Sequence, residues 1–486
     1  MMNNVKSLLV VGGGTAGLVA ALILKKRLDI QVDLVYSKSI GIIGVGEGST
    51  EHFREFMEFV GINQYDLIKE CDATYKCGIM FEGWGDKDYL HCVIPPYNKK
   101  TAQYSTIYGH QIANNSSYVT PEIPWHNRVN RWFVNRPEEF PYNQFHFNTH
   151  KLNKFLFDIA SAAGIRIIED EINDIVLDDN GYIKHLTGSK QQYQYDFYID
   201  STGFKRPLME KLGAKWNSFG KYLKMKAAVV FPTGDEDNYN IWTLAKAMDY
   251  GWMFRIPVWG RHGNGYIFDS DYTNFDQAKA EVEKLFGREI DFGKEFKFDP
   301  GCLDRAWINN CCAVGLSGSF VEPLEATSIG TSIQQSFLLM HKLINYDQKV
   351  IDSYNKSFTD MMENIRDFIV LHYVTNKTNT QFWKDISSIE LPDTLKSKLD
   401  IWKNKLPIEE DFSELSDYKL FGVDNYTLIL EGLNLFNRDA IKKEFESNPS
   451  YIKYAAQQEI EKQLQFEKSV DTITHKKLLE LIRENF

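Results

Sequence analysis

The sequence lacks the features on which a disulfide-stabilised, nucleic-acid-binding or membrane-spanning protein would depend. Its six cysteines form no CxxC pair and stand near no histidine at metal-ligand spacing, so we expect reduced thiols and no metal site. The formal net charge of −11 argues against a nucleic-acid partner and against attraction to anionic membranes. These absences, with 43% hydrophobic and 25% charged residues, leave an ordinary soluble globular protein as the main expectation.

Long apolar runs are also absent. The most apolar segment, Leu8 to Leu24, contains four glycines and is shorter than the ~20 residues of a spanning helix. A secretory signal would explain the apolarity but not the glycine spacing. We therefore expect a buried strand, a tight turn and a helix here, and a cytoplasmic protein.

Length and periodicity indicate an α/β protein of more than one lobe. At 486 residues the chain exceeds the usual ~100–200 residues of one domain. Residues 7–36 predict strand, glycine turn, helix and strand, which is a βαβ unit. Further expected elements are a helix at 52–61, one strand at 74–84, a helix at 151–163 and a helix from Thr331 to Ile344. After about residue 353 the pattern is helical.

A dinucleotide fingerprint occupies the first turn. In Gly12-x-Gly14-x-x-Gly17 the first glycine allows the tight turn, the second lets the backbone approach a pyrophosphate, and the third permits close helix packing. The free N–H groups of the following helix favour phosphates. The acidic residue expected after the second strand is missing, because Tyr36-Ser37 stands there. Ser37 is the remaining candidate for a ribose contact.

A second segment indicates which dinucleotide cofactor the protein binds. The sequence DFYIDSTGF, Asp196 to Phe204, resembles the middle motif of flavoprotein oxygenases and favours FAD over NAD. No second GxGxxG is present, so we expect reduced FAD to come from a separate flavin reductase.

Five segments together resemble a known family. They are YKCGIMFEGW, GVGEGST, GWMFRIP, SFVEPLEATSI and RDFIVLHYVTNKTNTQFW. In these motifs and their order, the chain resembles flavin-dependent halogenases of the tryptophan-halogenase type. The resemblance implies a Rossmann-like FAD-binding fold of the flavoprotein monooxygenase type, and an enzyme that uses FADH2, O2 and halide to make hypohalous acid. It assigns to the FAD site Gly12, Gly13, Gly14, Thr15, Ala16, Gly17, Ser37, Gly44, Val45, Gly46, Glu47, Ile172, Gly203, Leu316 and Ile329.

Lys76 and Glu325 match the catalytic pair of that family. The resemblance implies that Lys76 captures or holds the hypohalous acid, and that Glu325 positions it and takes a proton. On the residues alone, Lys76 could extend from a strand edge, in a strand with Tyr75 and Cys77 on the opposite face. Glu325 could equally be a carboxylate at a helix N-terminus.

Thr327 and Ser328 match the halide-binding pair, next to a helix start that suits an anion. The family usually has serine at position 326 and glycine at 328, where this chain has Ala326 and Ser328. The change predicts bromide or iodide rather than chloride as the preferred halide.

The tunnel and substrate residues implied by the resemblance are His91, Trp252, Phe254, Pro257 and Tyr426. Trp252 and Phe254 would separate flavin from substrate, although two aromatics on a strand are also ordinary core residues. Val93 stands where free-tryptophan enzymes carry a ring. We therefore expect electron-rich aromatics such as indoles and phenols as substrates, with poor use of free tryptophan.

The sequence divides into three regions. We expect a discontinuous FAD-binding lobe (1–90, 151–220 and 300–345), a substrate-side lobe (91–150 and 221–299) and a helical C-terminal region (346–486). A homo-oligomer is compatible with the sequence. Two alternatives stay open at this point: a flavin-dependent aromatic hydroxylase and a non-catalytic carrier with an FAD fold.

Overall fold

The βαβ unit predicted for residues 7–36 lies at the centre of a six-stranded sheet in the computed structural model. The structure describes residues 4–44, 46–92, 104–114, 129–130, 144–469 and 472–486. The sheet order is β20-β21-β12-β1-β2-β8. Their bounds are β1 Ser7–Val11, β2 Gln31–Tyr36, β8 Arg166–Glu169, β12 Phe197–Asp200, β20 Trp307–Ile308 and β21 Cys311–Ala313. All neighbours are parallel except β20 and β21. The expected Rossmann-like fold is confirmed.

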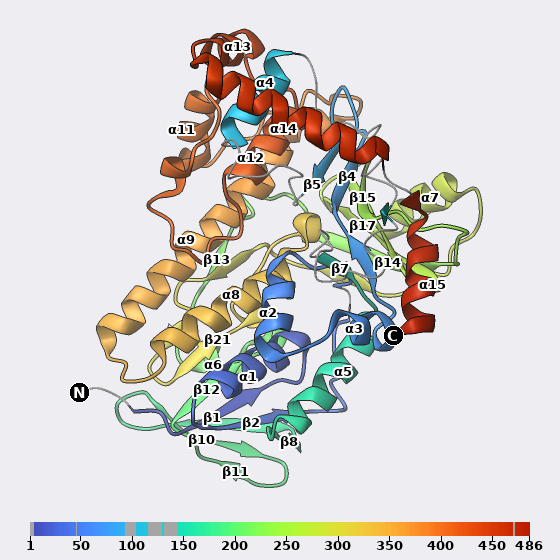
Figure 1. Ribbon diagram of the computed structural model, residues 1–486. Coiled ribbons are helices and arrows are strands. Elements are labelled where there is room, and N and C mark those ends of the chain that lie inside the picture. Colours follow the sequence, from blue (N-terminus) through green and yellow to red (C-terminus); the bar gives the residue numbers. More distant parts are fainter. Residues whose placement is uncertain (1–3, 45, 93–103, 115–128, 131–143, 470–471) are drawn as a thin grey trace.

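Helices cover this sheet because its central strands are apolar on both faces. Leu8, Leu9 and Val10 of β1 are fully buried. The helix α1, Thr15–Arg27, packs against α5, Thr149–Ala162, and against α8, Thr327–Lys342. Figure 1 shows these helices with the sheet at the base of the molecule.

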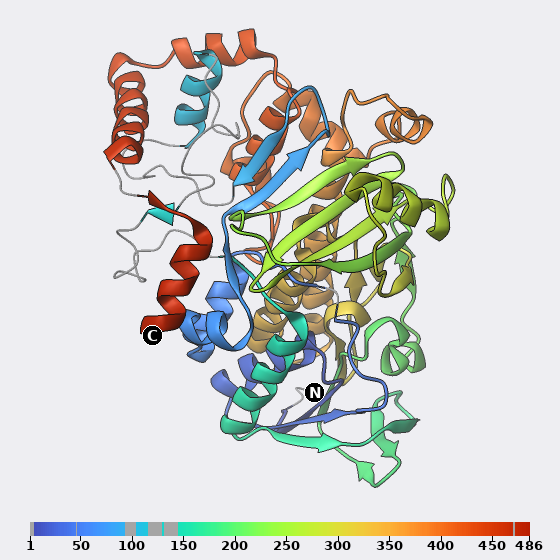
Figure 2. The same ribbon diagram turned by 90° about the vertical axis from the view of Figure 1, so that its right-hand side faces the viewer.

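A seven-stranded sheet forms the second lobe, in the order β18-β14-β17-β16-β15-β4-β5. Its bounds are β4 Gly78–Glu82, β5 Tyr89–Cys92, β14 Ala227–Thr233, β15 Trp242–Met248, β16 Gly251–Val258, β17 Arg261–Phe268 and β18 Glu295–Lys297. Only β15 and β4 pair in parallel. Figure 2 shows this sheet face-on, with α7, Phe275–Phe286, beside it.

The single strand expected at 74–84 is wrong: the chain divides at Cys77. The strand β3, Thr74–Lys76, pairs with β7, Gln144–His146, whereas β4 joins the seven-stranded sheet. The N–H of Cys77 donates a hydrogen bond to the carbonyl oxygen of Ile241 instead. A Cβ on Gly78 would lie 2.0 Å from the carbonyl oxygen of His91, so only glycine permits β4 and β5 to approach this closely. The predicted alternation of faces does not run through Cys77.

Over the described residues after Tyr346 the chain is helical, as predicted, apart from one short strand. The helices are α9 Gln348–His372, α10 Gln381–Ser387, α11 Asp393–Trp402, α12 Val423–Gly432, α13 Arg438–Glu446, α14 Ser450–Ser469 and α15 His475–Asn485. The strand β23, Thr472–Ile473, pairs with β6, Val129–Asn130. Figure 1 shows α9 rising from the base of the molecule to the upper helices, which include α4, Tyr104–Ala113.

The last helix returns to the strand that carries Lys76. The helix α15 packs on α3, Gln64–Glu70. The Nε2 atom of His475 accepts a hydrogen bond of 3.1 Å from the N–H of Tyr75. Burial lowers the pKa of His475 to about 4, so the ring is neutral and accepts as this contact requires.

The remaining elements connect these parts. They are α2 His52–Val60, β9 Ile172–Leu177, β10 Ile183–Gly188, β11 Gln192–Tyr193, α6 Pro207–Lys211, β13 Trp216–Ser218, β19 Gly301–Leu303 and β22 Ser319–Phe320. Among the described residues, no helix combines the length and the apolarity that crossing a membrane requires. All six cysteines are buried as thiols.

Candidate active site

The glycine turn after β1 forms a cradle open to a ligand. Gly12 has a φ of +120°, and a Cβ there would lie 2.3 Å from the carbonyl oxygen of Ser201. At Gly14 a Cβ would meet no atom within 4 Å, so this backbone faces open space. Gly14 is also the N-cap of α1, and no side chain caps that helix end. Thr15 and Ala16 begin the helix, and their N–H groups are therefore available to a phosphate.

A carboxylate reaches the end of β2 from the connection between β8 and β9. The hydroxyl groups of Ser37 and Ser39 both donate to Oε2 of Glu171, at 3.3 and 3.1 Å. Glu171 precedes Ile172, the first residue of β9. The spacing after the glycine motif could not reveal Glu171, because the parallel pairing of β2 with β8 brings it there.

The loop at 44–50 lies over the same lobe. Gly44 has a φ of +68°, and a Cβ on it would lie 2.7 Å from the ring of His150. Gly46 faces open space, and its carbonyl accepts from the hydroxyl of Thr149. Glu47 forms an ion pair with Arg261 of β17. Val45 lies outside the described residues.

Two further segments complete the cradle. The N–H of Gly203 donates to Oγ of Ser317 at 3.0 Å, and that hydroxyl lies 3.0 Å from Oδ1 of Asp200. A Cβ on Gly315 would lie 2.5 Å from Cβ of Ala16, so this turn packs directly on the start of α1. Leu316, in the turn at Gly315, and Ile329, near the start of α8, are both partly buried. An uncapped helix end, open glycine backbone and converging turns fit the phosphates and rings of FAD.

Lys76 is buried at the end of β3, next to Cys77, where the chain passes from the β3–β7 pair into the seven-stranded sheet. Its side chain is 2% exposed, and Nζ donates to the carbonyl oxygen of Ser49 at 2.7 Å. Burial lowers the pKa of Lys76 to about 8, although the negative charges of Glu325 and Glu51 oppose the shift. Lys76 is therefore an amine that loses its proton near neutral pH.

Glu325 lies between two histidines. Nδ1 of His91 is 3.0 Å from both carboxylate oxygens, and Nε2 of His372 is 2.9 Å from Oε1. Burial raises the pKa of Glu325, but the two histidines outweigh burial and hold the pKa at about 2. His372 was not singled out from the sequence, although it lies in the motif RDFIVLHYVTNKTNTQFW.

The helix α8 begins at Thr327, four residues before the predicted start, and Ala326 is its N-cap. Ala326 has a φ of +54°, and a Cβ on Gly48 would lie 3.6 Å from its Cβ. Thr327 is buried and Ser328 is exposed. Both residues line a small cavity with Ser319, Phe320, Val321, Thr331 and Met362. An uncapped helix start at a cavity suits an anion such as a halide.

Trp252 and Phe254 are buried neighbours on β16, with ring centroids 6.2 Å apart. The indole N–H of Trp252 donates to Oε1 of Glu322 at 3.1 Å, and the hydroxyl of Tyr373 donates to the same oxygen. Burial raises the pKa of Glu322 to about 7, against the lowering effect of these two donors. Glu322 was not identified from the sequence as a site residue.

The predicted substrate residues His91, Pro257 and Tyr426 have different surroundings. His91 belongs to the Glu325 cluster, and the carbonyl of Pro257 accepts from the hydroxyl of Thr74 at 2.7 Å. Tyr426 is fully buried, donates to the carbonyl of Asn364 at 3.2 Å and packs against Phe368. Val93 lies outside the described residues.

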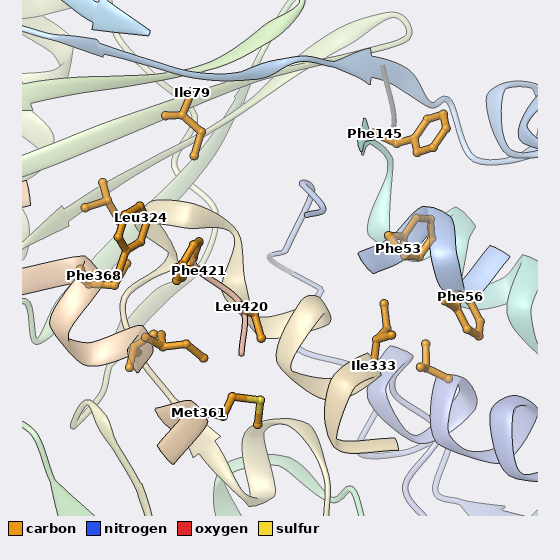
Figure 3. Packing of buried hydrophobic residues seen from close by; sticks show 14 of the residues in the cluster. Phe53, Phe56, Ile79, Phe145, Leu324, Ile333, Met361, Phe368, Leu420 and Phe421 are labelled. Carbon is orange, nitrogen blue, oxygen red and sulfur yellow. The ribbon is translucent and has the colours of Figure 1, made fainter. Parts of the chain in front are cut away.

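The ring of Phe368, in α9, lies between the C-terminal helices and the segment that carries Glu325. Phe368 stacks on Phe421, with centroids 4.0 Å apart. Figure 3 shows Leu324 in this cluster, with Ile79 of β4 pointing toward it from the sheet. Leu324, the residue before Glu325, thus belongs to the buried apolar core.

Comparison with known proteins agrees with these features. A family model described as tryptophan halogenase matches residues 7–444. The chain is 30% identical over 453 residues to the 7-chloro-L-tryptophan 6-halogenase of Kutzneria sp. (strain 744), covering 83% of this chain and 86% of that protein. It resembles the solved tryptophan C-6 flavin-dependent halogenase (chlorinase) from taromycin biosynthesis, with 27% identity, a TM-score of 0.88 and coverage of 98% and 100%. A tryptophan halogenase from Shewanella frigidimarina NCIMB 400 shares the fold at 23% identity, with a TM-score of 0.88 and coverage of 99% and 98%.

Proposed function

This chain belongs to the tryptophan halogenase family, and on that premise we propose that it halogenates electron-rich aromatics such as indoles and phenols, through Lys76. It is an FADH2-dependent halogenase. The finer proposal includes bromide or iodide as the preferred halide and a separate flavin reductase as the source of FADH2. The observation that carries it is the burial of Lys76, whose Nζ donates to the carbonyl of Ser49 and which lies within reach of the negative charge of the buried Glu325.

When bound, reduced FAD supplies the reducing power with which O2 and halide yield hypohalous acid. The residues that would hold the cofactor are the glycines after β1, the loop at 44–50 and the turns at Gly203 and Gly315. Thr327 and Ser328 would hold the halide at the uncapped start of α8.

Lys76 receives the hypohalous acid. With a pKa of about 8, roughly a tenth of the side chain is neutral amine at pH 7. The lone pair of the amine attacks the halogen of hypohalous acid, the oxygen–halogen bond breaks, and the hydroxide that leaves takes up a proton of the amine as water. The ammonium form instead holds hypohalous acid by a hydrogen bond. Its contact with the carbonyl of Ser49 fixes the amine beside the loop at 44–50.

Glu325 accepts protons and hydrogen bonds at this point. Its pKa of about 2 keeps it ionised, so it orients Lys76 or hypohalous acid through its charge. A carboxylate with so low a pKa is a weak base. It can still accept the proton of a halogenated ring cation, because that cation is a strong acid.

Trp252 and Phe254 separate the cofactor region from the substrate. Their rings are buried, and Glu322 and Tyr373 fix the indole of Trp252 by hydrogen bonds. A rigid aromatic barrier passes a halide or hypohalous acid but not an aromatic substrate. Several relatives are named tryptophan halogenases, and we propose that this chain prefers aromatic substrates that are held less tightly.

The test combines the purified protein with a flavin reductase, NADH, FAD and equal concentrations of chloride, bromide and iodide. Indoles, phenols and free tryptophan are supplied as separate substrates, and products are identified by mass spectrometry. The expected result is brominated or iodinated indoles and phenols. Hydroxylated products without halogen would contradict the proposal, as would efficient chlorination of free tryptophan alone.

A further inference from the structure

His146 of β7 is fully buried, and its ring joins a threonine of β3 to a threonine of β15. Nδ1 lies 3.2 Å from Oγ1 of Thr74, and Nε2 lies 2.8 Å from Oγ1 of Thr243. We infer that His146 is a positioning residue for halogen transfer, which fixes Lys76 relative to its carbonyl partner and to the strand that carries the aromatic barrier. The inference rests on the role proposed above for Lys76.

The hydroxyl of Thr74 determines the direction of the first contact. Its single hydrogen goes to the carbonyl oxygen of Pro257 at 2.7 Å, because a carbonyl oxygen can only accept. Nδ1 of His146 therefore carries a hydrogen and donates it to Thr74. A ring protonated at both nitrogens donates to Thr74 in the same way, so the inference does not depend on the charge of His146. The hydrogen bonds from His146 to Thr74 and from Thr74 to Pro257 tie β7 and β3 to the end of β16.

The second ring nitrogen ties the same histidine to the neighbouring strand of the large sheet. Thr243 lies in β15, which pairs with β16 on one side and with β4 on the other. The side chains of Thr74, His146 and Thr243 are all buried. A buried polar group that loses its partner finds no water in its place, so these hydrogen bonds favour one arrangement of the four strands β3, β7, β15 and β16.

The strand that carries His146 also holds the acceptor of Lys76. Thr74 of β3 is the register partner of His146. The next residue of β7, Phe145, accepts from the N–H of Ser49 at 3.0 Å and donates its own N–H to Oγ of Ser49 at 2.9 Å. Nζ of Lys76 in turn donates to the carbonyl oxygen of Ser49 at 2.7 Å. A shift of β7 along β3 would therefore move Lys76 and its acceptor relative to each other.

The same link sets the distance between Lys76 and the barrier. The strand β16 carries Trp252 and Phe254, past which hypohalous acid would travel to reach Lys76. A displacement of about 1 Å at a reacting group costs on the order of 10²-fold in rate. Without the contacts of His146, hypohalous acid should still form, but a larger part of it should miss Lys76 and escape into solution.

The test measures how much hypohalous acid reaches the substrate. The full-length protein with FAD, a flavin reductase, NADH and bromide receives an indole and an excess of monochlorodimedone, which captures hypobromous acid in solution. The readout is the ratio of brominated indole to brominated trap, which a mere loss of folded protein does not change. In Thr74→Val, which keeps the shape but removes the hydroxyl, the ratio should fall on the order of tenfold. Thr74→Ser keeps the hydroxyl and should keep the wild-type ratio.

A second pair of variants tests the contact between His146 and Thr243. His146→Asn places an amide near the position of Nδ1 and loses the contact with Thr243, whereas Thr243→Val removes the same contact from the other side. Each should lower the ratio by a similar factor, and the double variant should lose little more, because both remove one interaction. His185→Asn, at a half-buried histidine of β10 outside the site, is the matched control and should keep the wild-type ratio.

Unchanged ratios in Thr74→Val and Thr243→Val would overturn the inference, as would a ratio in Thr74→Ser as low as that in Thr74→Val. If His146→Asn does not fold, the threonine variants decide. Lys76→Ala in the same assay tests the proposed function separately. Full bromination of the indole by Lys76→Ala would refute the role of Lys76, whereas an inactive Lys76→Ala beside an unaffected Thr74→Val would refute only the positioning by His146.

Discussion

The indole N–H of Trp252 and the carboxyl of Glu322 form a buried hydrogen bond of 3.1 Å. The same oxygen of Glu322 accepts from Tyr373, whereas the second oxygen, Oε2, has no described partner. A carboxyl with one unpaired oxygen in an apolar site favours its protonated form. The aromatic barrier is therefore anchored by a group whose charge depends on pH near neutrality.

Glu322→Gln should make stability less dependent on pH. Burial raises the pKa of Glu322 from 4.5 to about 7, so the folded protein retains a proton that the unfolded chain releases above pH 4.5. This contribution is complete below pH 4.5 and is lost as the pH rises to 7, by roughly 3 kcal/mol. Calorimetry should show that the Tm of the variant rises relative to the Tm of the wild type as the pH increases from 5 to 8. Glu410→Gln, at an exposed glutamate, is the control. An unchanged difference in Tm across this range would contradict the prediction.

Lys76→Ala should abolish halogenation while FAD binding and NADH-driven release of hydrogen peroxide continue. Lys76 acts after hypohalous acid forms, so its loss leaves the flavin reaction intact. Product and peroxide are measured in the same assay, with Lys154→Ala, at an exposed lysine, as the control. Full halogenation by Lys76→Ala would remove Lys76 from the mechanism.

Glu325→Gln should lower the halogenation rate on the order of 10²-fold, the usual scale for a positioned acid–base group. The Tm should change little, because the amide keeps an acceptor for His91 and a donor for His372. Steady-state rates and thermal melting are measured together. A collapsed Tm with full activity in the folded remainder would identify Glu325 as a helix-capping residue.

Bromide or iodide should be used in preference to chloride. Larger halides are easier to oxidise and to desolvate, so they tolerate the side chain of Ser328 and the absence of a hydroxyl at Ala326. Competition at equal halide concentrations measures the preference. Combining A326S with S328G should move the product ratio toward chloride. A predominantly chlorinated product from the wild type would refute the prediction.

Free tryptophan should be a poor substrate. Val93 removes a stacking ring, and an aromatic pair is worth ~0.5–1.5 kcal/mol beyond its buried area. A loosely held substrate follows intrinsic ring reactivity, so indoles unsubstituted at C3 should react at C3. Rates and product positions are compared between simple indoles and tryptophan. Faster and selective reaction on the benzene ring of free tryptophan would show a pocket that clamps its substrate.

Local pattern was sufficient to predict the βαβ unit at residues 7–36. The apolar strand, the glycines at 12–17 and the helix after them follow each other directly, so the sequence determines their order and contacts. The roles of Lys76 and Glu325, which the halogenase motifs imply, stay a prediction.

Contacts between distant segments could not be predicted. The break at Cys77 arises because β7 pairs with β3 and the seven-stranded sheet takes β4. The early start of α8 depends on the left-handed conformation of Ala326, a residue type that rarely caps a helix. One partner of Glu325, His372, and one partner of Glu322, Tyr373, come from the end of α9, and only the folded chain brings them to these carboxylates.

The bond between Tyr75 and His475 joins residues 400 positions apart. At a synthesis rate of about 5–20 residues per second, the ribosome delivers His475 roughly 20–80 seconds after Tyr75. During that interval the strand that carries Lys76 is without its last covering helix. A chaperone that binds exposed backbone at this strand would have its longest opportunity then, because the N–H of Tyr75 gains its partner His475 only at the end of synthesis.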